Sequence, residues 1–301
     1  MSEVDGTVVV LNWQGGAWLE DCLRTLLEQT ATNYRVLVVD NGSTDRSEEI
    51  AAKFDVDWMP LGRNLGFSIA NNLGARAAAG RWLIFANNDM RFDREFVAQV
   101  SHRLFADEAT FAVDVGQRDW EGNLSHGAIR VTTSTIGGFG FDESYPNAET
   151  AVAFGNGGAL GVRRDRFEEI GGWDERMFAG SEDVDLSWRA WLRGWVTVYL
   201  PHVLAHAKIG GASSTEAGRV IRRRSVVKGR LVFAAKHLPL LIAARDWLSF
   251  APRALVQREL RPAVLESLRD LPGIFRERRG LYAHTSPGAH LAQMERLGAN
   301  E

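Results

Sequence analysis

One cysteine, Cys22, occurs in the 301 residues of the sequence, so the chain cannot form an internal disulfide. That usage is typical of proteins in a reducing compartment. Apolar residues share a helical face with Cys22, which predicts a thiol in the core rather than a nucleophile. The N-terminus lacks the basic patch and apolar run of a secretory signal. The longest clean apolar run near the C-terminus, Leu238–Ala244, is too short to span a bilayer, so we expect a cytoplasmic protein.

Charge is distributed unevenly along the chain. Hydrophobic residues make up 45% and charged residues 24%, as in an ordinary globular protein with a net charge of -3. Residues 216–280 contain fifteen Lys and Arg but six Asp and Glu, so the remainder of the chain is strongly acidic. An acidic body with a basic C-terminal region suggests an anionic partner for that region. Nucleic acid fits poorly, because no recognition motif accompanies the charge.

The first hundred residues alternate between buried strands and amphipathic helices. The expected strands cover 7–11, 34–39, 56–59 and 82–86. This β-α-β order predicts a mostly parallel, Rossmann-like α/β sheet with helices on both faces. Ligands of such sheets bind at the carboxyl ends of the strands, and Asp40, Asn64 and Asp89 follow strands there.

The pattern changes beyond this sheet. Phe111–Thr133 predicts a hairpin or irregular strands around a Glu-Gly-Asn turn, and the Gly-rich Ile136–Ala148 predicts a mobile loop. We expect the catalytic domain to end near residue 215. Its first 110 residues would form a nucleotide-binding half, and 111–215 an acceptor half. Residues 216–301 are expected to be a basic amphipathic helical appendage whose last twenty residues are frayed.

Three carboxylates fall within four residues of the stretch Ser181–Arg189. A well-capped helix start explains them, because Ser181 is a good N-cap and acids are favoured in a first helical turn. An active site is the other interpretation, because two more element ends carry suitable groups. The strand that leads to Asp89 ends in an acid, and His206 follows another apolar run. A base, a metal-binding acid and an imidazole would then be available.

Two familiar nucleotide-binding folds fit the chain poorly. A dinucleotide-binding fold requires Gly-x-Gly-x-x-Gly after the first strand, where this chain has the bulky segment Asn12–Trp18. Asp40 does match the acid expected after the second strand of that fold. A sugar-phosphate nucleotidyltransferase would carry basic residues in a Gly-rich loop at the first position, and this loop has none.

Six short motifs occur together in one family's order and spacing. They are Val10–Trp13, Val38–Asp45, Asn64–Phe67, Asn87–Asp89, Gly171–Glu175 and Glu182–Leu186. With them the chain resembles glycosyltransferase family 2 over roughly residues 5–235, most of all the rhamnosyltransferase-type enzymes of bacterial cell-envelope polysaccharide synthesis. The resemblance implies a GT-A fold, an inverting mechanism, a nucleotide-diphosphate sugar donor and a divalent cation, Mg²⁺ or Mn²⁺.

The resemblance also assigns roles to residues. Asp183 matches the general base, and the sequence leaves open whether the helix dipole lowers its pKa or burial raises it. Asp89 and His206 match metal-binding positions, although Asn87 replaces the first acid of the family's Asp-x-Asp motif. The matched donor-binding residues are Leu11, Asn12, Asp40, Asn41, Asn64, Gly66, Asn88 and Asp89. The residues expected to contact the acceptor or orient the base are Trp173, Asp174 and Glu182.

The implied reaction transfers rhamnose from dTDP-rhamnose to a hydroxyl of a glycan or lipid-linked acceptor. Alternatives are another UDP- or GDP-linked sugar, or a non-catalytic nucleotide-sugar-binding protein, since Asn87 breaks the metal motif. The loop Gly137–Asn147 and the turn Gly155–Gly158 are expected to shape the acceptor pocket. The basic region is expected to hold the enzyme peripherally on the inner face of the plasma membrane. Packing on the acidic body or a homodimer interface is the alternative.

Overall fold

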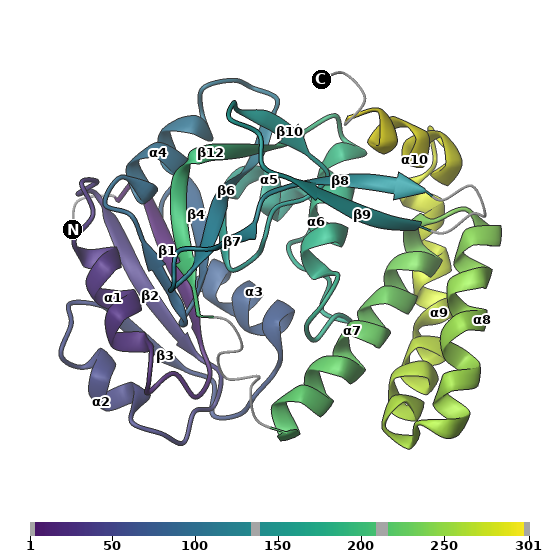
Figure 1. Cartoon of the computed structure of the whole chain (residues 1–301), viewed down its shortest axis with the longest axis horizontal. Helices are drawn as coiled ribbons and strands as arrows, with labels where there is room; N and C mark the ends of the chain where they lie inside the picture. Colours follow the sequence, from purple (N-terminus) through teal and green to yellow (C-terminus); the bar gives the residue numbers. More distant parts are fainter. Residues whose placement is uncertain (1–3, 134–138, 209–215, 298–301) are drawn as a thin grey trace.

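The computed structural model describes residues 4–133, 139–208 and 216–297 (Figure 1). Its centre is a ten-stranded sheet with strand order β10-β12-β6-β11-β4-β1-β2-β3, in which β5 also pairs with β12 and β7 with β6. A separate two-stranded sheet joins β8 to β9. The predicted α/β class and mostly parallel sheet are confirmed.

The strands are β1 (Gly6–Asn12), β2 (Tyr34–Asp40), β3 (Asp57–Pro60), β4 (Trp82–Asn87), β5 (Met90–Phe92), β6 (Thr110–Asp119), β7 (Leu124–His126), β8 (Ala128–Thr133), β9 (Phe139–Ser144), β10 (Thr150–Val152), β11 (Ala159–Arg163) and β12 (Val196–Ala207). The helices are α1 (Leu19–Leu27), α2 (Ser47–Ala51), α3 (Phe67–Ala77), α4 (Phe96–Arg103), α5 (Arg164–Glu169), α6 (Glu182–Trp191), α7 (Glu216–His237), α8 (Leu240–Val256), α9 (Arg261–Leu281) and α10 (Pro287–Arg296), with a 3₁₀ turn at Arg258–Leu260.

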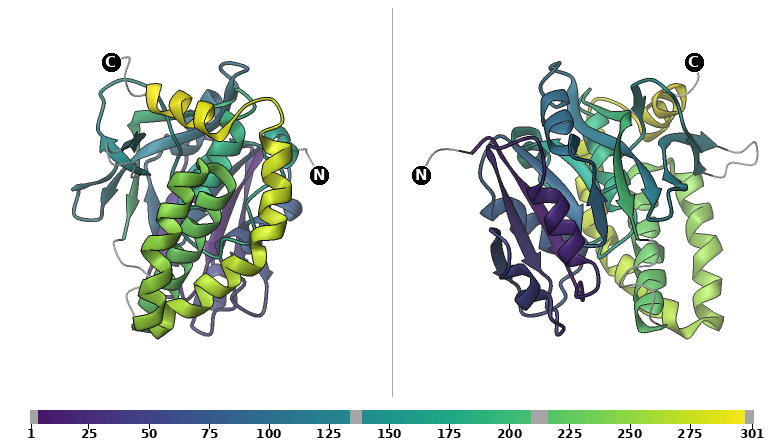
Figure 2. Two further views of the ribbon diagram at one scale, coloured as in Figure 1. Left: turned by 90° about the vertical axis from the view of Figure 1, so that its right-hand side faces the viewer. Right: turned by 60° about the vertical axis from the view of Figure 1, so that its left-hand side comes forward.

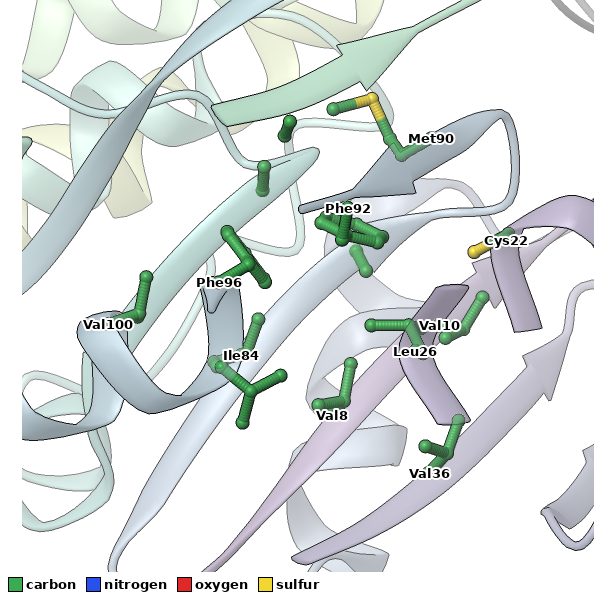
Figure 3. Packing of buried hydrophobic residues seen from close by; sticks show 14 of the residues in the cluster. Val8, Val10, Cys22, Leu26, Val36, Ile84, Met90, Phe92, Phe96 and Val100 are labelled. Carbon is green, nitrogen blue, oxygen red and sulfur yellow. The ribbon is translucent and has the colours of Figure 1, made fainter. Parts of the chain in front are cut away.

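The N-terminal strands are buried on both faces. β1 lies between β2 and β4 and runs parallel to both. Because successive side chains of a strand point to opposite faces, Val8 and Val10 pack in the cluster that includes α1 and α4, whereas Val9 packs in the cluster that includes α3. Cys22 lies in the first cluster and is fully buried, which confirms the predicted core position (Figure 3).

The second half of the sheet departs from the simple parallel order. β6 pairs in parallel with β12 and antiparallel with β11, and β6 and β7 form the predicted hairpin across the turn at 121–123. The prediction of a mobile loop over Ile136–Ala148 is wrong for residues 139–144. Residues 139–144 form β9, which pairs with β8, and Phe139 packs on Trp188 and Phe233. Residues 136–138 lie outside the described part.

The C-terminal helices pack side by side against the sheet domain, with α7 between the domain and α8, and with α9 packed against α7 (Figure 2). The sequence predicts a frayed C-terminal end, but in its described part residues 287–296 form α10. Ser286 accepts a hydrogen bond from the amide of Ala289 at the start of α10, and Leu291 and Met294 are buried. Among the described residues, no helix combines the length and apolar character needed to cross a bilayer.

Candidate active site

A cavity of about 500 Å³ opens at the carboxyl ends of β1 and β4. Four parts of the chain line it: the N-terminal strands and their loops, the segment from β6 to the start of α6, the end of β12, and the first turns of α7. This is the edge of a parallel sheet at which nucleotide ligands bind.

Six of the eight residues predicted to bind the donor line this cavity: Leu11, Asn41, Asn64, Gly66, Asn88 and Asp89. The other two, Asn12 and Asp40, are buried and connect to the lining through hydrogen bonds. Asn88 Nδ2 donates to Asn12 Oδ1 at 2.7 Å, and Asn12 Nδ2 donates to Asp40 Oδ1 at 2.8 Å. Asp40 Oδ2 also accepts from the amide of Ser43. This series of hydrogen bonds fixes the amide plane of Asn88 at the cavity wall.

The loop before α3 is shaped by two asparagines. Asn41 Oδ1 accepts from the amide of Leu65 at 2.8 Å, and Asn64 Oδ1 accepts from the amide of Gly66 at 2.9 Å. Gly66 has a positive φ of 86°. A β-carbon there would lie 2.5 Å from the ring of Phe178, so only glycine allows this close approach.

Asp89 is a carboxylate that has no side-chain partner within the described part of the chain. It follows β4, lines the cavity, and makes no side-chain hydrogen bond or ion pair with another described residue. Burial raises the pKa of Asp89 to about 6. A buried acid of this kind gains from a cation supplied by a ligand or metal. Asn87, which replaces the first acid of the family's motif, also lines the cavity.

Asp183 lies in the first turn of α6 and lines the same cavity. The N-cap expected from Ser181 is absent, because Ser181 has a left-handed backbone with φ 71° and makes no capping bond. Burial raises the pKa of Asp183 to about 6, which outweighs the opposing hydrogen bond from the amide of Val184 and the nearby charge of His126. Burial therefore decides the direction that the sequence leaves open.

Glu182 lies beside Asp183 in the cavity wall. Its Oε2 is buried and has no hydrogen-bond partner among the described residues. Burial, reinforced by the charge of Asp183, raises the pKa of Glu182 to about 8. At neutral pH the two adjacent carboxyl groups therefore differ: Glu182 is mostly protonated, and Asp183 is mostly ionised.

Sequence reasoning missed a polar group on β6. Gln117 is 3% exposed and lines the cavity, and its Nε2 has no hydrogen-bond partner among the described residues. Close by, Asp114 Oδ2 lies 2.9 Å from His126 Nε2, and Asp114 Oδ1 accepts from the amide of Asn156. Asp114 and the other acids nearby raise the pKa of His126 against the opposing effect of burial. Polar residues within a buried strand were the available signal.

Two segments were expected to shape the acceptor pocket, and the structure places them differently relative to the cavity. From the turn Gly155–Gly158, Asn156, Gly157 and Gly158 line the cavity. No described residue of Gly137–Asn147 lines it, and positions 137–138 lie outside the described part.

Besides Asn12 and Asp40, three predicted site residues do not line the cavity. Trp173 is 1% exposed and packs edge-on against Phe67 and Phe85, so it supports the cavity from the core. Asp174 accepts from Lys236 and Arg176 in a separate buried ion cluster. His206 has its Nε2 3.1 Å from Asp93, whereas its neighbour Ala207 lines the cavity. His206 alternates to the other face of β12 and does not join Asp89.

The C-terminal region contributes to the site, which the sequence did not predict. Gly218, Ile221, Arg222 and Val226 of α7 line the cavity. α7 approaches the segment before α6 so closely that a β-carbon on Gly229 would lie 1.8 Å from the carbonyl oxygen of Gly180. A helix from outside the sheet domain therefore forms one wall of the cavity.

Known proteins resemble the chain in sequence and fold. The model for "Glycosyl transferase family 2" matches residues 7–171. The N-acetylglucosaminyl-diphospho-decaprenol L-rhamnosyltransferase of Mycobacterium tuberculosis is 28% identical, over 88% of this chain and 97% of its own. Among solved structures, Staphylococcus aureus TarS 1-349 with UDP-GlcNAc has a TM-score of 0.58 at 15% identity, over 96% of this chain and 89% of its own. The Pyrobaculum calidifontis mannosyltransferase with GDP-Man and Mn²⁺ has a TM-score of 0.54 at 15% identity, over 100% and 84%.

The family model covers more than half of the chain, and the likeness to solved structures extends the GT-A fold across it. The chain is a nucleotide-sugar glycosyltransferase and belongs to glycosyltransferase family 2.

Proposed function

We propose that this enzyme transfers rhamnose from dTDP-rhamnose, with inversion, to a hydroxyl of a lipid-linked glycan. The observation that carries the reaction type is that Asp183 and Asp89 line one cavity and that burial raises the pKa of both to about 6. A carboxylate with that pKa is an effective base near neutral pH. The choice of rhamnose and of a lipid-diphosphate acceptor is supported by the name of the mycobacterial relative.

In the proposed reaction the acceptor hydroxyl attacks the anomeric carbon on the face opposite the diphosphate. Its proton passes to the Asp183 carboxylate as the new C–O bond forms. The bond between the anomeric carbon and the diphosphate oxygen breaks, and its electron pair stays on the diphosphate. The buried chain Asn88–Asn12–Asp40 would hold the nucleoside side of the donor, and Asn156 to Gly158 would border the acceptor.

A divalent cation fits this site as a ligand shared with the substrate. The described residues contain no group of three or more His, Cys, Asp or Glu side chains that could hold a metal. Asp89 would be the protein carboxylate, and donor diphosphate and water would complete the shell, which suits Mg²⁺ or Mn²⁺. When bound, the cation would neutralise charge on the leaving diphosphate.

The test is calorimetric titration of dTDP-, UDP- and GDP-sugars with and without Mn²⁺, followed by NMR of the product's anomeric configuration. We expect tightest binding of dTDP-rhamnose, loss of the metal dependence in Asp89→Ala, and an inverted product. A preference for a UDP- or GDP-sugar would replace rhamnose as the substrate. Binding without any transfer or donor hydrolysis would favour the non-catalytic alternative.

Peripheral membrane contact belongs to the same proposal, and its supporting observation is a separation of charges in residues 240–281. All five acids of this segment form ion pairs with cations of α7; they are Asp246, Glu259, Glu266, Asp270 and Glu277. Seven arginines of the segment are exposed: Arg245, Arg253, Arg258, Arg261, Arg269, Arg276 and Arg279. The exposed cations of this segment are therefore left without acidic partners from its own five acids, whereas most cations of α7 are neutralised internally.

Apolar side chains accompany these arginines. Leu241 is 87% exposed, Leu248 73% and Leu255 75%, at helical spacing along α8, and Phe275 of α9 is 41% exposed. Exposed leucine and arginine on the same helices favour an anionic bilayer, where each arginine contributes about 1 kcal/mol.

Flotation with anionic and neutral vesicles at low and high salt tests this contact. We expect flotation with anionic vesicles at low salt, weakened about 10- to 30-fold in Arg269→Gln/Arg276→Gln. The matched control Arg46→Gln/Arg94→Gln removes two exposed arginines of the sheet domain and should float like the wild type. Absence of flotation, together with a dimer in sedimentation, would assign the surface to a homodimer instead.

A further inference from the structure

Three consecutive arginines begin the basic stretch of α7, and their surroundings differ. Arg223 pairs with Glu259 at 3.4 Å and donates to Gln257 at 2.7 Å. Arg224 forms an ion pair with Glu266. Arg222 forms no hydrogen bond or ion pair with any described residue, and it is the one of the three that lines the active cavity.

The helical period explains this direction. Residues at spacings of four and three share one face of a helix. Along that face of α7, Val226 lines the cavity with Arg222, Gly229 touches the segment before α6, Phe233 packs edge-on against Trp188, and Lys236 pairs with Asp185. Four contacts on one stripe therefore fix which way Arg222 points.

The acidic lining of the cavity indicates a role for the cationic side chain of Arg222. Asp89, Glu182 and Asp183 line it, and within the described part of the chain Arg222 is the only lysine or arginine that does. A nucleoside diphosphate carries at least two negative charges into this acidic space. Asn87 in place of an acid leaves a single carboxylate for a metal, so a cationic side chain of the protein becomes more important for neutralising the diphosphate.

We propose that Arg222 binds the diphosphate of the donor and stabilises the charge that develops on it as the glycosidic bond breaks. The inference rests on the proposed function, since it names the part of the donor that α7 contacts. A guanidinium is always charged and can donate two parallel hydrogen bonds to phosphate oxygens, which makes it suited to this task. The first turns of α7 are accordingly part of the donor site.

The experiment compares Arg222→Gln with Arg223→Gln, which removes the same charge one residue away on another face. Calorimetry in Mg²⁺ measures UDP, dTDP and GDP, and then the nucleoside, without phosphate, of whichever binds tightest. We expect Arg222→Gln to weaken diphosphate binding about 10- to 100-fold and to leave nucleoside binding unchanged. Arg223→Gln should stay within about twofold of the wild type for both, and Arg222→Lys should recover part of the loss.

Unchanged nucleoside binding and melting temperature show that Arg222→Gln is folded, so a loss confined to the diphosphate supports the assignment. Wild-type diphosphate affinity in Arg222→Gln, or an equal loss in Arg223→Gln, would overturn it while leaving the proposed reaction intact. A wild-type enzyme that binds none of the three diphosphates would instead contradict the proposed function and this assignment with it.

Discussion

Lys236 Nζ lies 2.8 Å from Asp185 Oδ1, and both side chains are buried. The contact joins the C-terminal part of α7 to α6, two residues after Asp183. Asp185 also accepts from Arg189 and from His237, and these three groups hold the pKa of Asp185 well below its usual range although burial opposes them. Burial lowers the pKa of His237 to about 4, so its imidazole is neutral at pH 7.

The ion cluster around Lys236 is balanced. Its carboxylates are Asp174, Asp185 and Glu277, and its cations are Arg176, Arg189 and Lys236. Lys236→Met would leave one buried negative charge uncompensated, which typically costs about 3–5 kcal/mol in the free energy of unfolding. Urea denaturation measures it, and Arg279→Met, an exposed arginine on α9, is the control with an expected change below about 0.5 kcal/mol. A loss below about 1 kcal/mol in Lys236→Met would mean that α7 is not locked to α6 by charge.

The pH dependence of turnover should reflect two carboxylates. Asp183 and Asp89 each have a pKa raised to about 6 by burial, so both lose their charge as the pH falls through that value. A metal bound as proposed would keep Asp89 ionised. At saturating Mn²⁺ we therefore expect log kcat/KM to fall with a slope of 1 below pH 6, and at low Mn²⁺ with a slope approaching 2. Asp183→Asn should reduce kcat about 10²–10⁴-fold with donor affinity retained. A pH-independent kcat/KM between pH 5 and 7 would remove Asp183 from the role of base.

Glu182→Gln should separate the two adjacent carboxyl groups. Because Glu182 has a pKa of about 8, it is mostly neutral at pH 7, and the amide mimics that form. We expect kcat within about threefold of the wild type. The folded wild type keeps a proton that the unfolded chain releases above about pH 4.3, so its stability falls as the pH rises toward 8. The melting temperature of Glu182→Gln should therefore gain on the wild type between pH 5 and 8. A loss of kcat as large as that of Asp183→Asn would identify Glu182 as the base.

The sequence predicted the parts of the site that depend on local order. Strand ends in a parallel sheet meet at one edge, so the strand pattern alone is enough to bring Asn64 and Asp89 to one cavity. Trp173 and His206 were misplaced because residue type and strand position do not reveal which face a side chain takes. The sequence assigned Arg222 to a basic surface. Its actual direction, and the ion pairs of its neighbours, depend on how α7 packs on α6. Such contacts join residues far apart in sequence.

Gln117 offers a test of ligand recognition by a buried group. Gln117 lines the cavity, its buried Nε2 has no partner among the described residues, and a buried donor left unpaired costs about 1–3 kcal/mol. A sugar hydroxyl that accepted from this nitrogen would recover that cost. We expect Gln117→Met to be as stable as the wild type or more so, and to lower kcat/KM about 3- to 10-fold.

Gln29→Met is the matched control, because it replaces a buried glutamine whose bonds are all internal. Gln29 Nε2 donates to the carbonyls of Thr25 and Asp93, and its Oε1 accepts from the amide of Val97. Its loss should lower the melting temperature and leave kcat/KM nearly unchanged. The two variants should thus show opposite patterns of stability and activity. If Gln117→Met is destabilised and fully active, like the expected Gln29→Met, then Gln117 is structural and the sugar is bound by other residues.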